Sequence, residues 1–460
     1  MLKELIYKKA YNKKVLILGF GKEGQSTLKL LRRILPDQFF TIADKDINLE
    51  KSSAIINEDD NIKLILGEKY LDYTNDFDLI IKSPGISLDN ANKDVNISNL
   101  TSQTDLFINA FSGQIIGITG TKGKSTTASL VFHLLQQTTD NIVLSGNIGI
   151  PPFEVESNIN NSTIIILELS SHQLEYISAS PKTAVILNIY PEHLDHYSSF
   201  REYQKAKLNI TKFQRSDDHL IIPEDDLLIK KLLDNNSIER DTFEYSVHTK
   251  VKKGCYLESK SIIFSNNDDK VSVFSIDREL PLAGEHNLMN VMAAINICMV
   301  YDLPLKLISQ GIHTFKPLEH RMEFAGEFNG IKYYNDSIST IPESTIHALQ
   351  SIKDVNTLIL GGFDRGIDYD NLISFIIRSK LENIILTGKV GQRIYEGLIK
   401  DSGTHQNLYF TERFAEVIEI AGKVTRKGHS CLFSPAAASY DKFKNFEERG
   451  RLFKKHISET

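Results

Sequence analysis

The sequence has few of the features that mark secreted or nucleic-acid-binding proteins. Its three cysteines, Cys255, Cys298 and Cys431, are widely spaced and odd in number, and no CxxC pair occurs. They therefore predict neither a disulfide framework nor a zinc site. The net charge is −6 and no dense basic tract is present, which argues against nucleic acid as the main partner.

Long apolar runs are also absent. Runs such as Ile164–Leu167 are far too short to cross a bilayer, and the N-terminus lacks the apolar core and cleavage site of a signal peptide. We therefore expect a cytoplasmic protein without a membrane partner, and we expect a monomer. At 460 residues the length allows about three domains, each with its own core.

One stretch carries the clearest chemical signal, Gly117-Ile-Thr-Gly-Thr-Lys-Gly-Lys-Ser-Thr-Thr127. It follows an apolar run that predicts a buried strand and precedes apolar residues at helical spacing. A glycine-rich turn between strand and helix offers unpaired N–H groups to phosphate. We expect Lys124 to reach the β- and γ-phosphates of a nucleoside triphosphate and the Ser125 hydroxyl to ligate Mg²⁺. The strict motif has glycine where this chain has Ile118, so the loop is a variant.

A second glycine-rich turn lies nearer the N-terminus. Lys14–Leu18 predicts a strand, Gly19-x-Gly21-x-x-Gly24 follows it, and Asp44 ends the next strand twenty residues after the third glycine. This is the spacing of a dinucleotide-type fingerprint, in which the acid meets a ribose. A purely structural turn and a nicotinamide oxidoreductase remain alternative interpretations.

Further strands alternate with helices, which predicts an α/β protein with parallel sheets and ligands at the carboxyl ends of the strands. Glu168 lies near such an end, where a carboxylate can hold Mg²⁺ opposite Ser125. His193 and Asp195 follow the next strand, at the same predicted edge. The charged residues of the last predicted helix, from Asp441 onward, are expected to form mostly a solvated face.

Several ordered motifs together resemble the Mur ligase family of peptidoglycan-precursor synthetases, over nearly the whole chain. The motifs shared across that family are Gly120–Thr126, His286–Asn290 and His320-Arg321. Those typical of its D-glutamate-adding members are Gly146–Pro151, Glu168–Leu174, Asn188–Asp195 and Ser434–Gly450.

The resemblance implies three α/β domains. A Rossmann-like domain of residues 1–109 would hold the UDP of a sugar nucleotide, a central domain of residues 110–314 would hold ATP, and residues 315–460 would bring the amino acid. The implied reaction belongs to cell-wall biosynthesis. ATP converts the terminal carboxylate of UDP-N-acetylmuramoyl-L-alanine to an acyl phosphate, and the amine of D-glutamate attacks it through a tetrahedral intermediate to form an amide.

The resemblance also assigns residues to each ligand. The residues implied for ATP are Gly120, Thr121, Lys122, Gly123, Lys124, Ser125, Thr126, Asn290, Arg321 and Asp336. Those implied for the UDP-sugar are Gly19, Gly21, Gly24, Asp44, Ser83, Asn147 and His193. Those implied for D-glutamate are Thr340, Arg365, Ser439 and Phe446. The implied catalytic residues are Lys124, Glu168, His193 and Lys207. The implied ligands of two Mg²⁺ ions are Ser125, Glu168, His193 and a CO₂-derived carbamate on Lys207.

The chain departs from the family pattern at three places. Ile338 stands where lysine is commoner, Arg365 where lysine is common, and Lys122 where asparagine is usual. These differences concern contacts with the amino acid and the phosphates. Alternatives are another Mur-type or folylpolyglutamate-type ligase with a different acceptor, a nicotinamide oxidoreductase, and a nucleotide-driven switch or interaction protein.

Overall fold

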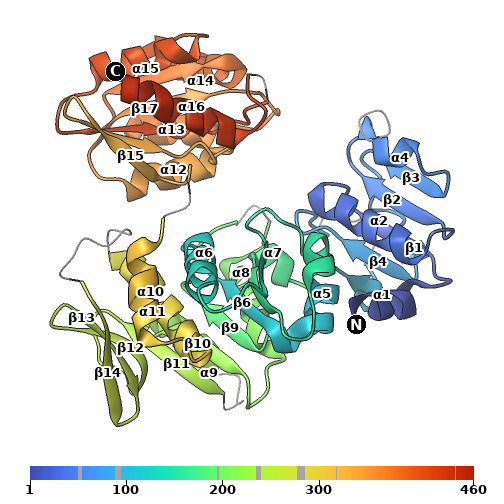
Figure 1. Cartoon of the computed structure of the whole chain (residues 1–460). Coiled ribbons are helices and arrows are strands. Elements are labelled where there is room, and N and C mark those ends of the chain that lie inside the picture. Colours follow the sequence, from blue (N-terminus) through green and yellow to red (C-terminus); the bar gives the residue numbers. More distant parts are fainter. Residues whose placement is uncertain are drawn as a thin grey trace. The chain divides into compact units, whose positions relative to one another are not determined.

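Three sheets with flanking helices form the part of the chain that the computed structural model describes, residues 1–49, 54–88, 95–193, 196–234, 240–276, 285–316, 319–440 and 442–459 (Figure 1). The chain divides into two compact units, Met1–Phe315 and Lys316–Thr460, and the first unit contains two of the sheets. This architecture confirms the predicted α/β class. No helix within those described ranges is long and apolar enough to cross a membrane.

The N-terminal sheet is parallel, with the order β3-β2-β1-β4-β5. Its strands are β1 (Val15–Leu18), β2 (Phe40–Asp44), β3 (Ile62–Leu66), β4 (Leu79–Lys82) and β5 (Leu100–Thr101). Its helices are α1 (Leu2–Ala10), α2 (Lys22–Ile34), α4 (Ala54–Asn57) and α5 (Gln103–Phe111), with the 3₁₀ turns η1 (Thr74–Asp76) and η2 (Ile97–Asn99). Every residue of β1 is buried between β2 and β4. The strand order reverses beside β1, so the turn after it lies where such sheets bind ligands.

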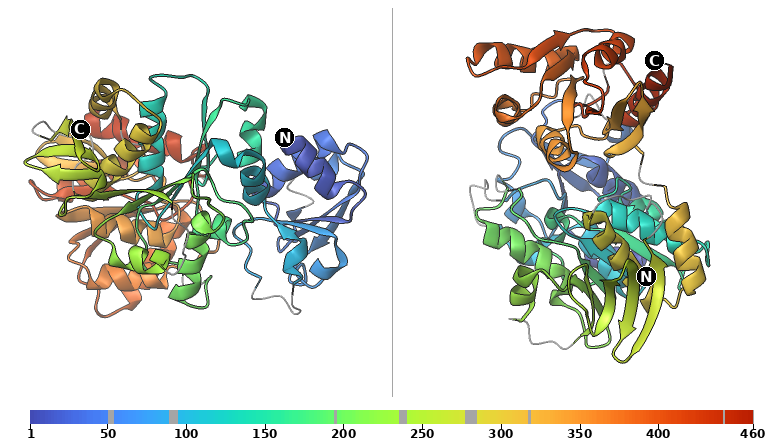
Figure 2. Two further views of the ribbon diagram at one scale, coloured as in Figure 1. Left: turned by 90° about the horizontal axis from the view of Figure 1, so that it is seen from below. Right: turned by 90° about the vertical axis from the view of Figure 1, so that its left-hand side faces the viewer.

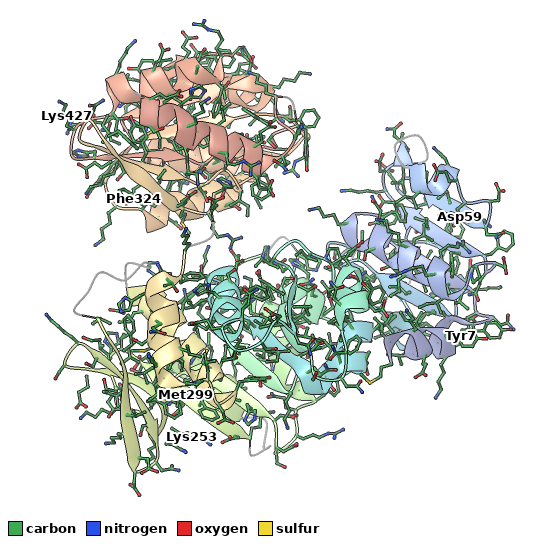
Figure 3. The ribbon with its side chains drawn as sticks, viewed as in Figure 1. Tyr7, Asp59, Lys253, Met299, Phe324 and Lys427 are labelled. Atoms are coloured by element: carbon green, nitrogen blue, oxygen red, sulfur yellow. The ribbon has the colours of Figure 1, made fainter. Side chains whose placement is uncertain are left out.

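The central sheet has nine strands in the order β14-β13-β12-β11-β10-β9-β6-β8-β7. They are β6 (Ile115–Thr119), β7 (Ile142–Gly146), β8 (Ile164–Glu168), β9 (Thr183–Ile186), β10 (His219–Pro223), β11 (Asp241–Ser246), β12 (Lys253–Glu258), β13 (Ser261–Asn266) and β14 (Asp269–Ser275). Pairing is parallel from β7 to β12, and antiparallel from β12 through β13 to β14 at one end of the sheet (Figures 1 and 2). Lys253, labelled in Figure 3, pairs with Asp241 and so joins β12 to β11.

Helices cover this sheet and supply much of its apolar core. They are α6 (Lys124–Leu135), α7 (Ser171–Leu174), α8 (Phe200–Lys212), α9 (Leu227–Asp234), α10 (Glu285–Val300) and α11 (Leu305–Thr314), with the 3₁₀ turns η3 (Ser112–Gln114) and η4 (Pro152–Asn158). The α6 and α10 helices share one buried cluster that includes Leu130, Leu134, Val291 and Ile295. The α6 helix is therefore packed against α10 and the sheet.

The C-terminal sheet has the order β15-β16-β20-β17-β18-β19. Its strands are β15 (Glu323–Phe328), β16 (Ile331–Asn335), β17 (Val355–Gly361), β18 (Asn383–Thr387), β19 (Asn407–Phe410) and β20 (Ser430–Phe433). Its helices are α12 (Pro342–Ser351), α13 (Asp370–Arg378), α14 (Gly388–Lys400), α15 (Phe414–Val424) and α16 (Phe446–Glu459). Among the described strands of this sheet, the β15–β16 pair is antiparallel and the other pairs are parallel. Arg449 in α16 is buried, so the expectation of a solvated charged face is wrong for this residue.

Candidate active site

The glycine turn after β1 is formed by close backbone packing. Gly19 has a φ of +86°, and a Cβ there would lie 2.9 Å from the Cβ of Ser83. A Cβ on Gly24 would lie 2.2 Å from the Gly19 carbonyl oxygen, to which the Ser83 hydroxyl donates at 2.9 Å. A Cβ on Gly21 would have no neighbouring atom within 4 Å. The structure thus brings these four predicted residues together and leaves room at the start of α2.

Asp44 lies at the same turn. Its two carboxylate oxygens accept the N–H groups of Phe20, at 2.7 Å, and of Asp46, at 2.9 Å. The acid therefore fixes the conformation of the glycine turn, in addition to lying at the edge where the spacing predicts it. A carboxylate oxygen has further acceptor capacity, so these bonds leave Asp44 able to meet a ligand hydroxyl.

The central glycine loop runs from β6 into α6, which begins at Lys124. The predicted strand, glycine turn and helix therefore follow one another in the structure. Gly123 caps the helix at a φ of +86°, and a Cβ there would lie 2.4 Å from the side-chain oxygen of Asn290. A Cβ on Gly120 would lie 2.9 Å from that of Leu187. Glycine is needed at both places, and the packing also brings Asn290, from α10, against the loop.

Two lysines meet at one carbonyl group of this loop. The Lys124 amine donates to the carbonyl oxygens of Gly120, at 2.8 Å, and Thr121, at 3.0 Å. The Lys207 amine, from α8, donates to the same Gly120 oxygen at 2.8 Å and lies 4.9 Å from the ring centre of Tyr203. Lys207 is 1% exposed, and burial, followed by the charge of Lys124, lowers its pKa well below the usual value. Lysine shifts its pKa readily when it is buried, and here the shift favours the neutral amine.

Glu168 ends β8 and is fully buried. One carboxylate oxygen accepts the side-chain amide of Asn147 at 2.8 Å, and the other has no hydrogen-bond partner in the described part of the chain. Leaving such an atom unpaired costs free energy, so the oxygen is well suited to a cation. Across the described ranges, His, Cys, Asp and Glu side chains do not gather in groups of three or more that could hold a metal ion. A Mg²⁺ ion at Glu168 would therefore need hydroxyl, water or substrate oxygens as its other ligands, which is usual for Mg²⁺.

Histidine rings gather beside this edge. His193, with a φ of +57°, lies 4.8 Å from the ring of His172, which in turn lies 4.2 Å from the ring of His196. Burial, and next the neighbouring His196, lower the pKa of His172 to about 3. Sequence reasoning did not single out His172 or His196, although His172 stands four residues after Glu168 in a motif that it did quote. Asp195 lies outside the described residues.

Arg321 and Asp336 lie close together in the C-terminal unit. Asp336 is 2% exposed, and its carboxylate accepts the N–H of Met322 at 3.1 Å and the hydroxyl of Ser434 at 2.7 Å. Burial raises its pKa to about 6, while the charge of Arg321 acts in the opposite direction. Asn290, predicted to share their ligand, belongs to the first unit.

The four residues predicted for the amino acid gather at the carboxyl ends of β16, β17 and β20, which are neighbours in the sheet. Arg365 follows β17, and its guanidinium donates to the Thr340 carbonyl oxygen at 2.7 Å. Ser439 follows β20 and is buried, and Phe446 begins α16 with its ring 6.4 Å from that of His320. The structure therefore brings these predicted residues to one edge of one sheet.

Comparison with known proteins gives a consistent result. The family model described as the Mur ligase middle domain matches residues 118–298. A UDP-N-acetylmuramoylalanine–D-glutamate ligase of Thermoanaerobacter sp. (strain X514) is 32% identical over 451 residues, which is 97% of this chain and 98% of that protein. A protein of the same name from Clostridioides difficile (strain 630) is 33% identical over 459 residues, with coverage of 97% and 98%.

Solved structures share the fold. The MurF ligase from Thermotoga maritima in complex with ADP aligns with a TM-score of 0.52 at 16% identity, covering 99% of this chain and 97% of that one. A pseudomurein peptide ligase type C from Methanothermus fervidus aligns with a TM-score of 0.52 at 18% identity, covering 97% and 100%.

Proposed function

This chain belongs to the family of UDP-N-acetylmuramoylalanine–D-glutamate ligases, among the Mur ligases, and we propose that it uses ATP to join D-glutamate to UDP-N-acetylmuramoyl-L-alanine. One observation carries the proposal. A phosphate-binding loop, two lysines on its Gly120 carbonyl, and the buried Glu168 with an unpaired oxygen follow adjacent strands of a single sheet. Family membership argues against the nicotinamide oxidoreductase that the N-terminal glycine turn alone leaves open.

Each sheet takes one ligand in this proposal. Residues 1–109 bind the UDP-sugar, residues 110–314 bind ATP, and residues 315–460 bind D-glutamate. The division of the chain after Phe315 supports the start of the third domain. The open space at Gly21 and the first turn of α2 suit a phosphate, because helix N-termini attract anions, and Asp44 suits a ribose hydroxyl. Asn147 and His193 extend the UDP-sugar site toward the reacting carboxylate.

Activation of the carboxylate brings two anions together. The ammonium group of Lys124 lies on the loop and would hold the β- and γ-phosphates, which reduces that repulsion. Mg²⁺, when bound, supplies further positive charge at the phosphate oxygens. Glu168 and Ser125 would hold one ion, and His193 together with a carbamate on Lys207 would hold the second. The lowered pKa of Lys207 supports this assignment, because only a neutral amine reacts with CO₂.

The second half-reaction forms the amide. The deprotonated amine of D-glutamate attacks the acyl phosphate carbon, and the tetrahedral intermediate expels phosphate. Arg365 offers a charge-assisted bond to a carboxylate of the amino acid, and the Ser439 hydroxyl adds a neutral one. Asn290, Arg321 and Asp336 would hold the adenosine of ATP.

The test is ATP-dependent phosphate release with UDP-N-acetylmuramoyl-L-alanine and D-glutamate, L-glutamate or no amino acid. We expect release with D-glutamate alone, its loss in Lys124→Ala, and its retention in Lys205→Ala, a change at an exposed lysine of α8. Release with L-glutamate would move the amino-acid specificity, and no release with either would overturn the proposal. The cytoplasmic location and the monomeric state stay predictions.

A further inference from the structure

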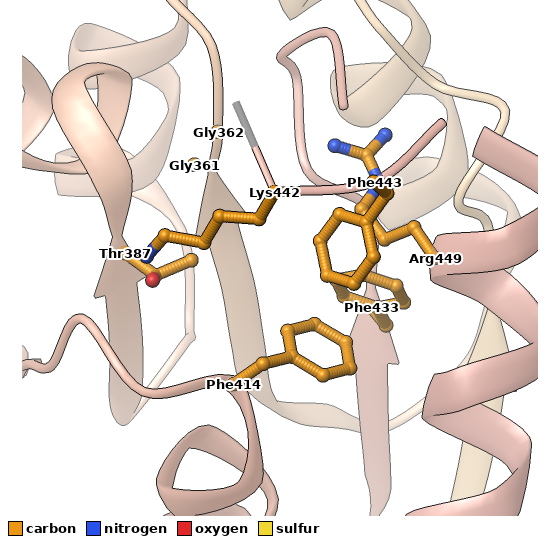
Figure 4. Close-up of a pocket in the computed structure, with 8 residues that line it drawn as sticks. All are labelled: Gly361, Gly362, Thr387, Phe414, Phe433, Lys442, Phe443 and Arg449. Carbon is orange, nitrogen blue, oxygen red and sulfur yellow. The ribbon is translucent and has the colours of Figure 1, made fainter. Parts of the chain in front are cut away.

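Arg449 of α16 is the largest of the fully buried side chains in the described part of the chain. It lines a small cavity together with Gly362, Phe433 and Phe443 (Figure 4). The volume of that cavity, about 10 Å³, is no more than one water molecule needs. An amino acid therefore cannot bind there, and any effect of Arg449 on a substrate must act through the residues that it holds.

The guanidinium group joins the ends of two neighbouring strands. Its Nε donates to the Ser337 hydroxyl at 3.0 Å and one terminal nitrogen donates to the Ser337 carbonyl oxygen at 2.8 Å, just after β16. The other terminal nitrogen donates to the carbonyl oxygens of Ala437, at 3.0 Å, and Ala438, at 3.2 Å, just after β20. Arginine suits this position because its planar fork directs donors to several acceptors at once, whereas a lysine ammonium is a single point.

The same bonds reach a third loop and the start of α16. The Ser337 hydroxyl, while accepting from Arg449, donates to the Phe446 carbonyl oxygen at 2.8 Å. The Ala438 carbonyl oxygen also accepts the N–H of Phe363 at 2.9 Å, which lies in the loop after β17. A Cβ on Gly362, in the same loop, would lie 3.2 Å from a guanidinium nitrogen of Arg449. One buried side chain thus sets the spacing of three loops and a helix start.

We propose that Arg449 is a positioning residue for the amino-acid substrate. The segments that it joins carry Thr340, Arg365, Ser439 and Phe446, so it sets the distances among the groups that bind glutamate. The inference rests on the proposed function, because that function assigns these four residues to D-glutamate. The expected consequence is a change in the KM for the amino acid and not in the KM for the other two substrates.

The test compares Arg449→Lys with Arg451→Lys, a matched change at an exposed position of the same helix. We expect the KM for D-glutamate to rise at least tenfold in Arg449→Lys and to stay within twofold in Arg451→Lys. The KM values for ATP and for UDP-N-acetylmuramoyl-L-alanine should stay within twofold in both. A purely structural role would lower the active fraction, and hence kcat, without changing the KM for D-glutamate, and that result would overturn the inference.

A milder variant covers the case in which Arg449→Lys does not fold. Ser337→Ala removes the hydroxyl between Arg449 and Phe446 but keeps the Ser337 carbonyl group, and we expect it to raise the KM for D-glutamate several-fold. An unchanged KM for D-glutamate in Ser337→Ala overturns the inference. The proposed function is not affected by that result, provided that the wild type is active. Absence of D-glutamate-dependent phosphate release in the wild type overturns both, so the two failures are distinguishable.

Discussion

Replacing Lys207 by methionine should abolish ligation without destabilising the fold. Lys207 is 1% exposed, and the Gly120 carbonyl oxygen that accepts its amine also accepts the Lys124 amine. The carbonyl therefore keeps a donor when the Lys207 amine is removed. Methionine has nearly the same length and fills the same space without a polar atom that needs a partner.

The repulsion between a charged Lys207 and Lys124 can be calculated from the distances between their amines and the Gly120 carbonyl oxygen. Both amines lie 2.8 Å from one oxygen, so the two nitrogens are at most twice 2.8 Å, or 5.6 Å, apart. Two positive charges at that separation repel by about 3 kcal/mol at an effective dielectric constant near 20. This repulsion and burial both oppose a charged Lys207. Methionine loses one hydrogen bond worth about 1 kcal/mol and gains apolar burial of about the same size, so above pH 10.5, where the amine is neutral in both states, we expect a net change within about 1 kcal/mol. Below that pH Lys207→Met should be more stable than the wild type, because folding of the wild type requires the amine to lose its proton. Lys207→Ala should instead cost about 2–5 kcal/mol through the cavity that it leaves.

The assay is urea unfolding in CO₂-free buffer at several pH values, with Lys205→Met as the exposed control on the same helix. Because the pKa of Lys207 is lowered in the folded state, the unfolded chain binds more protons between that pKa and the ordinary value of 10.5. The wild-type free energy of unfolding therefore rises with pH across this window, and Lys207→Met should lack that contribution. A loss of more than about 3 kcal/mol in Lys207→Met, or a pH slope equal to that of the wild type, would show that the buried Lys207 amine is not a neutral group that an apolar side chain can replace.

Three further predictions concern two carboxylates, Glu168 and Asp336, and one histidine, His172. Glu168→Gln keeps the acceptor for the Asn147 amide but removes the negative charge, so we expect at least a tenfold higher Mg²⁺ concentration for half-maximal activity. An unchanged Mg²⁺ concentration would show that Glu168 does not hold the ion. The pKa of His172 is about 3 in the folded state against the ordinary 6.5, so the wild type should lose about 3 kcal/mol of stability as the pH falls from 6.5 to 4. His172→Phe should lose less stability over this range in acid unfolding followed by circular dichroism, and identical profiles of the two proteins would contradict this. The pKa of Asp336 is about 6 in the folded state against the ordinary 3.8, so its contribution to the free energy of unfolding falls by about 3 kcal/mol as the pH rises from 3.8 to 6. In urea unfolding, Asp336→Asn should show a smaller fall in stability over this pH range than the wild type, and an equal slope would contradict this.

Local patterns predicted the glycine turns well. Gly19, Gly24 and Gly123 stand at fixed offsets between an apolar strand and a periodic helix, and each offset reflects a backbone conformation or a close approach that the structure contains. Asp44 and Glu168 were likewise predicted from strand ends, because parallel strands bring their carboxyl ends to one edge.

Long-range packing explains what sequence reasoning missed. Lys207 was reached only through the family resemblance, since a lysine within a helix ordinarily suggests a solvated charge, and its burial results from the packing of α8 against the phosphate loop. Arg449 was included in a charged face for the same reason, although it bonds Ser337, which is 112 residues away in the sequence. The cluster at His172 depends on rings from two separate segments, and no spacing rule relates them.

The most direct test of ligase activity is to follow the amide product itself. The protein is incubated with ATP, UDP-N-acetylmuramoyl-L-alanine and D-glutamate, and the products are measured by mass spectrometry together with ADP and phosphate. We expect one UDP-N-acetylmuramoyl-dipeptide, one ADP and one phosphate for each turnover, and no dipeptide product with L-glutamate. Formation of ADP and phosphate without the dipeptide product would show that the protein hydrolyses ATP without joining the two substrates.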